Sequence, residues 1–361
     1  MTEKKKTIFL TFTSVIISLL FIELFFQFKN SLKEKTINFT SEPAYLLFQQ
    51  GKVFKNIENV VKYHSNKTIK AEAYIYTENK FKQAYSYEIK TNNFGLVQKN
   101  NLKKNIPSIL FLGDSFTEGQ GVPAWIDKFE GNFSKYQIIN GGILATGPQQ
   151  FELMEKHVSR NYDVKKVLFL FIGHDIRRSP FLMSKKDLDC LNDYKKCIGS
   201  QTFLGYPISN KNPDIFLKSL RNQRIENYKN LSFAKKLKKK TKNFFSNLYI
   251  IKTPKTFLRE KFYKSKNIKI KKNFLSIKRL HEKYGKNIFF INLKTRNEIL
   301  NGREYESIYA ESFIKNLTNN FYSCEFDNDL SNFNPLDHHP NKKGYDNLFN
   351  CINGIMAEMI D

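Results

Sequence analysis

The chain of 361 residues carries 59 Lys and Arg against 34 Asp and Glu, a formal net charge of +25. Its hydrophobic content of 41% suits a packed core and excludes a collagen-like, coiled-coil or wholly disordered protein. The positive charge is compatible with an anionic membrane surface, an acidic polymer or a nucleic acid as neighbour. It is equally compatible with an AT-rich genome, which favours Lys, Asn, Ile and Phe in its proteins. The charge alone therefore identifies no partner.

The N-terminus has the pattern of a membrane anchor. Lys4–Lys6 precede an apolar run from Thr7 to Phe28 that only Glu23 interrupts, and such a run is long enough to span a bilayer core of about 30 Å. Basic residues ahead of the first span favour a cytoplasmic N-terminus with the rest of the chain periplasmic or extracellular. A cleaved signal peptide is the alternative, but no A-x-A-like cleavage site follows the run. We expect residues 1–28 to be an uncleaved anchor.

Residues 29–106 have the character of a stalk followed by a small mixed segment. The stretch 71–82 (AEAYIYTENKFK) alternates in polarity and predicts a strand, with Tyr85 to Lys90 as its hairpin partner.

A regular α/β pattern then occupies residues 107–361. Short apolar runs predict buried parallel strands, and helix-length stretches such as 149–159 separate several of them. The predicted strands are 108–112, 136–140, 166–172, 287–293 and a weaker fifth at 323–326. Strands alternating with helices predict a three-layer α/β/α domain with a parallel sheet. Polar motifs follow the strands at their C-terminal ends, where such sheets place their active sites.

A long basic insertion, 178–286, separates the third and fourth predicted strands. Between Lys218 and Lys286 its only acidic residues are Glu226, Glu260 and Glu282. Interleaved aromatic and aliphatic residues predict at least one basic amphipathic helix. Two interpretations remain open: the helix faces anionic lipid or glycan, or it is a solvated helical face over the sheet. No zinc-finger or RNA-binding signature is present, so we expect no nucleic-acid partner.

The four cysteines allow two disulfides in an exported protein. Proximity in sequence favours Cys190 with Cys197, which leaves Cys324 with Cys351 to tie the last strand to the last helix. Four unpaired thiols are the alternative. No Cys or His spacing typical of a zinc site is present.

Ser115 is the candidate nucleophile. It follows the first strand of the α/β region in the stretch Gly113-Asp114-Ser115, where a tight strand-to-helix turn exposes a hydroxyl at the top of the sheet. The backbone N–H of Ser115 would lie near a helix N-terminus, where partial positive charge stabilises an oxyanion. The flanking residues do not form the G-x-S-x-G elbow of α/β-hydrolases.

Asp337 and His339 are the candidate partners of Ser115. His339 precedes Pro340, which we expect in the first turn of an amphipathic C-terminal helix. Asp337 is placed to accept from the imidazole Nδ1–H, which leaves Nε2 of His339 free to take a proton from Ser115. Histidine suits this role because it both accepts and returns a proton near neutral pH.

These blocks together resemble the SGNH hydrolases, also called the GDSL family. The stretch Gly113–Gly119 resembles the family's nucleophile block, and Asp337–Gly344 resembles its final block. Asn140–Gly142 and Gly173–Asp175 resemble the two intermediate blocks, in the right order. Thr91–Gly95 resembles the lead-in of membrane-anchored bacterial members. The resemblance runs from about residue 92 to the C-terminus, with the basic insertion unmatched.

The resemblance implies a flavodoxin-like, five-stranded sheet and an oxyanion hole made by the N–H groups of Ser115 and Gly142 with the side chain of His174. His174 stands where the family has asparagine, so a working variant, altered acyl-transfer chemistry and a degenerate site all remain open. His338 could replace His339 as the base, but its position fits the family less well. Asp175 is expected to brace its loop.

The expected activity is that of a serine esterase removing acyl groups from cell-envelope glycans or lipids through an acyl-enzyme, with no metal or organic cofactor. Two alternatives stay open. One is an O-acyltransferase that passes the acyl group to an envelope polysaccharide. The other is a non-catalytic glycan- or protein-binding module on a decayed hydrolase fold.

Overall fold

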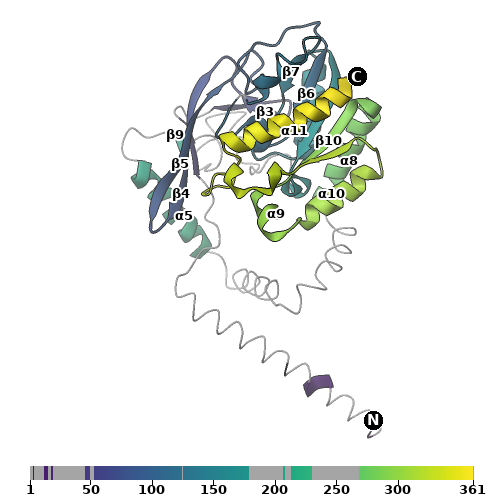
Figure 1. The fold of residues 1–361 in the computed structure, drawn as a ribbon. Helices are drawn as coiled ribbons and strands as arrows, with labels where there is room; N and C mark the ends of the chain where they lie inside the picture. Colours follow the sequence, from purple (N-terminus) through teal and green to yellow (C-terminus); the bar gives the residue numbers. More distant parts are fainter. Residues whose placement is uncertain are drawn as a thin grey trace. The chain divides into compact units, whose positions relative to one another are not determined.

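A computed structural model of the chain is shown in Figure 1. It describes residues 45–48, 53–123, 125–178, 206–207, 213–229 and 268–360, and the isolated positions 3, 12–14 and 18. Residues 43–219 and 267–361 form one compact unit, and 1–42 with 220–266 form another. The predicted anchor 1–28, much of the basic insertion and the pair Cys190 and Cys197 lie wholly or largely outside the described residues. Within the described part, no helix has the length and apolar character needed to cross a membrane.

A five-stranded parallel sheet is the centre of the larger unit. Its strands are β6 (Ser108–Leu112), β7 (Gln137–Asn140), β8 (Val164–Phe171), β10 (Ile288–Leu293) and β11 (Phe321–Cys324). They lie in the order β11-β10-β8-β6-β7, and every neighbouring pair is parallel. In chain order this is 2-1-3-4-5, the flavodoxin-like arrangement. The predicted fold class is confirmed for the α/β part, with strand ends within about three residues of those expected.

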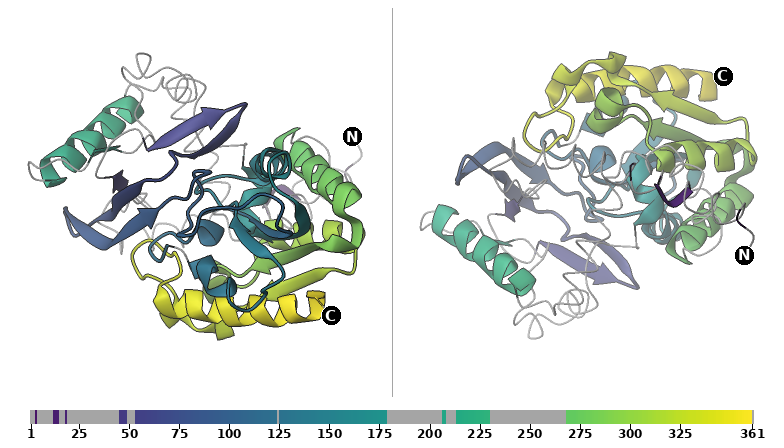
Figure 2. Two further views of the ribbon diagram at one scale, coloured as in Figure 1. Left: turned by 90° about the horizontal axis from the view of Figure 1, so that it is seen from above. Right: turned by 90° about the horizontal axis from the view of Figure 1, so that it is seen from below.

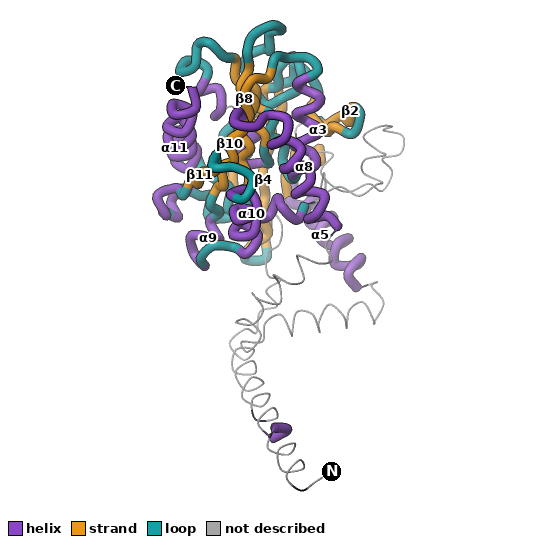
Figure 3. The backbone as a smooth tube through the Cα atoms, turned by 90° about the vertical axis from the view of Figure 1, so that its right-hand side faces the viewer, coloured by secondary structure: helices purple, strands orange, loops and turns teal. Residues whose placement is uncertain are grey.

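Helices cover both faces of this sheet. The helices of the described chain are α2 (Ser115–Glu118), α3 (Pro148–Ser159), α5 (Pro213–Lys229), α8 (Ile268–Tyr284), α9 (Arg296–Asn301), α10 (Tyr305–Lys315) and α11 (Lys342–Ile360). In both views of Figure 2, the yellow helix α11 and the green helix α8 lie on opposite sides of the strands, and Figure 3 shows the same layering edge-on. Helices α5 and α8 fall within the range predicted as a partly helical insertion.

The core on the α11 face explains why that helix is held rigidly. Its apolar stripe was predicted from spacing, and the structure buries Tyr345, Leu348, Ile352 and Met356 in one cluster with the strands. Burial of each such side chain contributes about 1.5–3 kcal/mol. The predicted position of Pro340 within the helix is wrong, because the side chain of Asn341 accepts from the N–H of Gly344 at 3.1 Å and caps the helix after the proline.

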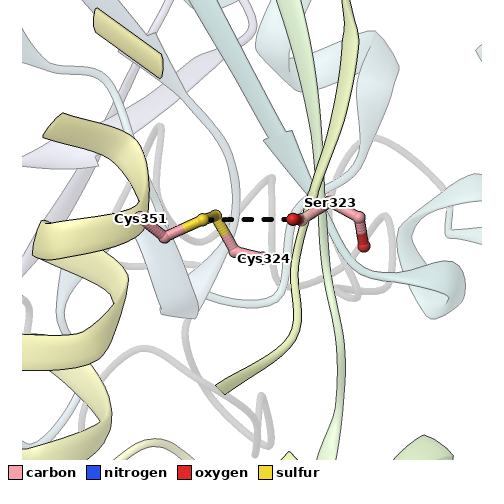
Figure 4. Close-up of a disulfide and its surroundings, with 3 residues drawn as sticks. All are labelled: Ser323, Cys324 and Cys351. Atoms are coloured by element: carbon pink, nitrogen blue, oxygen red, sulfur yellow. Dashed lines mark hydrogen bonds between the residues drawn. A yellow bond between two sulfur atoms is a disulfide. The ribbon is translucent and has the colours of Figure 1, made fainter. Parts of the chain in front are cut away.

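Cys324 of β11 and Cys351 of α11 form a disulfide, as predicted. Figure 4 shows the bond joining the strand to the helix, with Cys351 Sγ 3.9 Å from the carbonyl oxygen of Ser323.

A smaller set of strands comes mostly from the segment that precedes the α/β part. Strands β1 (Tyr45–Phe48), β4 (Thr68–Thr77), β5 (Lys80–Lys90) and β9 (Tyr206–Pro207) form one sheet, and β2 (Phe54–Ile57) pairs with β3 (Val60–Tyr63). The predicted hairpin is present, but its first strand ends earlier than expected. Glu78 and Asn79 have φ of 51° and 62°, which makes a two-residue turn in the middle of the predicted strand 71–82.

Candidate active site

The turn after β6 is built so that only glycine fits at its first position. A Cβ on Gly113 would lie 1.9 Å from Thr117 Oγ1 and 2.9 Å from the carbonyl oxygen of Leu170. The next residue, Asp114, accepts from the N–H of Phe116 through Oδ1 at 2.9 Å and so caps the short helix α2. Ser115 therefore stands at the C-terminal end of a central strand, where its side chain is fixed and largely buried.

The structure brings Ser115, His339 and Asp337 together in a chain of hydrogen bonds. Ser115 Oγ lies 2.9 Å from His339 Nε2, and His339 Nδ1 lies 2.9 Å from Asp337 Oδ2. The N–H of His339 also donates to Asp337 Oδ1 at 3.2 Å. An ionised carboxylate only accepts, so Nδ1 carries the proton and Nε2 is left to accept from the serine hydroxyl.

Asp337 stays ionised even though it is buried. Burial raises the pKa of its carboxyl, but hydrogen bonds from His339 and Tyr85 outweigh that effect and hold the pKa below its ordinary value. A charged Asp337 is what an imidazolium at His339 needs beside it during proton transfer.

His338 faces away from this chain of hydrogen bonds. Its φ is 68°, and its ring Nε2 lies 3.3 Å from Nη1 of Arg296. The left-handed conformation at His338 turns the two consecutive side chains in different directions, so that His338 contacts Arg296 and His339 contacts Ser115. The structure thus brings His339, and not His338, to Ser115.

A buried cation lies behind the nucleophile turn. Nη1 of Arg178 donates to Asp114 Oδ2 at 2.7 Å and to Asp175 Oδ1 at 2.5 Å. Asp175 also accepts from the N–H of Ile172 at 3.0 Å through Oδ2, so its expected role in bracing the loop is confirmed. Burial and the neighbouring Asp114 raise the pKa of Asp175, and Arg178 opposes that effect. No sequence motif points to Arg178.

The N–H of Gly142, expected in the oxyanion hole, is directed at its own loop. It donates to Asn140 Oδ1 at 3.0 Å. Glycine is required here because a Cβ would lie 2.4 Å from the backbone nitrogen of Glu118. The close approach of Gly142 to α2 is enough to explain why glycine stands at this position, with no need for a role of its N–H in the oxyanion hole.

Glu118 holds the loop that follows Gly142. Its Oε1 accepts from Tyr63 Oη at 2.8 Å, and its Oε2 accepts from the N–H of Leu144 at 2.6 Å. Burial raises the pKa of Glu118 to about 8, although both hydrogen bonds oppose the rise and Asp114 adds to it. Glu118 was part of the motif read from the sequence, but nothing in the motif shows that it would be buried against Leu144.

Ala145 is the next residue of that loop and adopts an uncommon conformation. Its φ is 59°, in the left-handed region that non-glycine residues seldom enter. Within the described part of the chain, the N–H groups of Ala145 and Ser115 donate to no protein acceptor. Backbone held in such a conformation is common at functional sites.

His174 lies beside an acidic residue that the sequence analysis did not consider. Its Nε2 is 3.3 Å from Glu304 Oε2. Burial lowers the pKa of His174, although Glu304 opposes this, so the neutral ring is favoured near pH 7. In a neutral ring, the contact with this carboxylate favours the proton on Nε2 and leaves Nδ1 as an acceptor.

Among the described residues, no group of three or more His, Cys, Asp or Glu side chains is arranged to hold a metal ion.

Comparisons with known proteins give only distant likenesses. No family model and no curated protein sequence matches this chain. A lipase/acylhydrolase from Enterococcus faecalis is 11% identical with a TM-score of 0.33, covering 70% of this chain and 95% of that one. A GDSL-like lipase from Bacteroides thetaiotaomicron is 14% identical with a TM-score of 0.33, covering 73% and 93%. A carbohydrate esterase described as having divergent catalytic and non-catalytic binding functions is 11% identical with a TM-score of 0.32, covering 89% and 98%. At TM-scores this low, the likenesses assign neither a family nor an activity to this chain.

Proposed function

We propose that the protein is a serine esterase of the SGNH/GDSL type, with Ser115 as nucleophile, His339 as general base and Asp337 as the residue that orients the base. The observation that carries the proposal is the continuous hydrogen-bonded chain from Ser115 Oγ through His339 to Asp337, with 2.9 Å at each step. That geometry is what acyl transfer through a serine requires, whatever the surrounding fold.

The proposed reaction proceeds in two halves. Ser115 Oγ attacks the ester carbonyl carbon while its proton passes to His339 Nε2. The bond to the alcohol then breaks as the imidazolium returns that proton to the departing oxygen, and the acyl group remains on Ser115. Water enters, gives its proton to the same nitrogen and attacks the acyl carbon, and the carboxylic acid leaves as Ser115 recovers its hydrogen.

The oxyanion is assigned to one of the two backbone N–H groups first expected and to one new N–H group. The N–H of Ser115 is retained, and the N–H of Ala145 replaces that of Gly142, because Gly142 donates to Asn140 while Ala145 donates to no described acceptor. The left-handed backbone at Ala145 supports this assignment. His174 is assigned to the rim of the site beside Glu304, and not to the oxyanion.

The substrate and compartment are part of the proposal. We infer an acyl group on a cell-envelope glycan or lipid, reached by a domain held outside the cytoplasm by residues 1–28. The disulfide between Cys324 and Cys351 supports that compartment, since such bonds persist in oxidising environments and are rare in the cytosol. Basic residues of the insertion outside α8 would face anionic lipid or glycan of the envelope.

Hydrolysis of an aryl acetate by the full-length protein tests the activity. We expect turnover by the wild type and by Ser159→Ala, a serine at the end of α3 away from the site, and a loss of at least about a thousandfold in Ser115→Ala and His339→Ala. Equal rates in wild type and Ser115→Ala would exclude the proposed nucleophile.

A second assay separates the esterase from an O-acyltransferase. The purified protein is given an acetylated donor with and without an unacetylated envelope glycan, and free acetate and acetylated glycan are both measured. An esterase releases the same amount of acetate in both samples. Appearance of acetylated glycan at the expense of free acetate would identify the transferase instead.

A further inference from the structure

A tyrosine from the N-terminal strands reaches the candidate active site. Tyr85 lies on β5, and its hydroxyl donates to Asp337 Oδ2. The same oxygen of Asp337 accepts from His339 Nδ1 at 2.9 Å. Tyr85 is 252 residues away from Asp337 in the chain, so this contact exists only because β5 packs beside the α/β domain within one compact unit.

The direction of the hydrogen bond at Tyr85 is fixed by a second partner. Gln120 Nε2 donates to Tyr85 Oη at 2.6 Å. With its oxygen accepting from Gln120, the hydroxyl is free to give its proton to the carboxylate of Asp337, which only accepts when ionised. Burial, and then the charge of Asp337, raise the pKa of Tyr85 well above its ordinary value, so the hydroxyl keeps its proton at any pH at which an esterase works.

These hydrogen bonds complete a closed ring that joins the nucleophile turn to the turn carrying Asp337 and His339. Gln120 belongs to the turn that follows the nucleophile, and its N–H donates to the carbonyl oxygen of Ser115 at 3.0 Å. The ring therefore runs from Ser115 to His339, Asp337, Tyr85 and Gln120, and back to Ser115. Within the described chain, His339 and Tyr85 are the two residues whose hydrogen bonds join the nucleophile turn to Asp337.

We propose that Tyr85 is a positioning residue of the esterase site: its hydroxyl fixes the carboxylate of Asp337 against His339 and ties both to the nucleophile turn. The strands that precede the α/β domain are then a working part of the active site. This inference rests on the proposed function of the same site, because the geometry that Tyr85 maintains is that of proton transfer from Ser115.

The neighbouring tyrosine on the same strand supplies a matched control. Tyr87 is buried two residues along β5, and its ring centroid lies 5.7 Å from that of Tyr85. The hydroxyl of Tyr87 has no hydrogen-bond partner among the described residues. Tyr85→Phe and Tyr87→Phe thus remove the same atom from the same strand, and only one of them touches Asp337.

The proposal predicts a specific kinetic signature for Tyr85→Phe. Without the hydroxyl, the carboxylate of Asp337 loses one donor, is held less firmly and becomes more basic. Loss of orientation lowers kcat about tenfold with KM within about twofold, because the orientation of His339 matters for proton transfer and not for substrate binding. The more basic carboxylate stabilises the imidazolium of the free enzyme, so the acidic limb of the kcat/KM profile moves to higher pH by roughly half a unit.

Aryl acetate hydrolysis from pH 4.5 to 9 by the full-length wild type, Tyr85→Phe and Tyr87→Phe tests this, with the thermal unfolding midpoint of each measured alongside. Support comes from a lower kcat and a shifted acidic limb in Tyr85→Phe alone. A kcat within twofold of wild type and an unshifted limb in Tyr85→Phe would overturn the positioning role while leaving the esterase intact. A purely structural effect would also overturn the positioning role. In that case kcat falls equally in both variants, in step with the unfolding midpoint, and the acidic limb of the kcat/KM profile does not move. An inactive wild type would remove the proposed function itself, and the role of Tyr85 with it.

Discussion

Ser115 and His339 are 224 residues apart in the chain and meet because each stands on a short, strongly constrained turn. On one side, Gly113 and Asp114 fix the turn after β6. On the other, Asp337 binds both the ring and the backbone N–H of His339. Two rigid supports of this kind provide the preorganised geometry that proton transfer needs.

Replacing the carboxylate that orients the base should nearly abolish turnover. In Asp337→Asn the amide can no longer stabilise an imidazolium, and it favours the wrong tautomer of His339. We expect kcat to fall about a thousandfold to ten-thousandfold with little change in KM. Steady-state hydrolysis of an aryl acetate measures both constants, and a loss below tenfold would show that Asp337 is not the orienting group.

His174 should matter much less than an oxyanion donor. Its Nε2 lies beside Glu304 and its pKa is lowered chiefly by burial, so His174→Ala is expected to reduce kcat less than about tenfold. Removal of a true oxyanion donor reduces kcat about 100- to 1000-fold. Rates for His174→Ala and His174→Asn at pH 7 distinguish the two cases, and a hundredfold loss that asparagine restores would return His174 to the oxyanion hole.

At the scale of elements, the loop after β7 depends on a carboxyl group whose pKa burial raises in the folded protein. Glu118 has a folded pKa of about 8 against an ordinary value of 4.5. Because the folded state binds this proton more tightly, the contribution of Glu118 to stability is complete below pH 4.5 and is lost as the pH rises toward 8.

Glu118→Gln should remove that pH dependence. The amide is neutral at every pH and is able to accept from Leu144 while donating to Tyr63. Between pH 5 and 8, we expect the free energy of unfolding of the wild type to fall relative to that of the variant by about 1 kcal/mol per pH unit. Urea unfolding at several pH values measures the difference, and parallel curves would show that Glu118 is ionised in the folded state.

Ala145→Gly should stabilise the same loop without loss of activity. A left-handed conformation costs a non-glycine residue about 1 kcal/mol, and glycine adopts it freely. Since only the backbone N–H of Ala145 is assigned to the reaction, kcat should stay within about twofold while the free energy of unfolding rises by about 0.5–1 kcal/mol. Lower stability together with lost activity would argue that the methyl group has a packing role at the site.

The sequence predicted the elements whose signals are local. Apolar runs, three of them followed by glycine, located the strands of the parallel sheet, and the spacing of apolar residues located α11. The hairpin boundary at Glu78 and Asn79 was missed because those residues carry no glycine to mark the turn. Pro340 was expected in the first turn of the helix, whereas the helix begins at Lys342, because Asn341 caps it.

The candidate site was predictable only in part, for a physical reason. Residue types and block order pointed to Ser115, Asp337 and His339, but the direction of an N–H or a ring depends on distant neighbours. Gly142 is directed by Asn140 and His174 by Glu304. The contribution of Tyr85 arises from packing between segments far apart in the chain, for which no local pattern exists.

Across the whole molecule, part of the basic charge is compensated within the fold. Arg279 of α8 pairs with Glu152 of α3 at 2.6 Å, and Lys283 pairs with Glu155 at 2.7 Å. These acids are buried while the cations are half exposed. For α8, these pairs favour a solvated helical face over a surface that faces anionic lipid or glycan. The remainder of the basic insertion lies largely outside the described residues.

The disulfide ties the last strand to the last helix and should add substantially to stability. Cys324 and Cys351 are 27 residues apart, and a bond closing a loop of this length stabilises by about 3 kcal/mol. The double variant Cys324→Ala/Cys351→Ala should unfold at correspondingly lower denaturant concentration. A reducing agent should weaken the wild type by more than it weakens this variant, which keeps Cys190 and Cys197. Equal stability of wild type and variant would show that the bond between Cys324 and Cys351 does not form.

Covalent labelling of Ser115 by a fluorophosphonate tests the central claim most directly. Such a probe bonds only to a serine that a neighbouring base has activated, and mass spectrometry of the digested protein locates the adduct. We expect one adduct, on Ser115, in the full-length wild type, a strongly reduced labelling rate in His339→Ala and no adduct in Ser115→Ala. No adduct on the folded wild type, or an adduct that persists in Ser115→Ala, would contradict it.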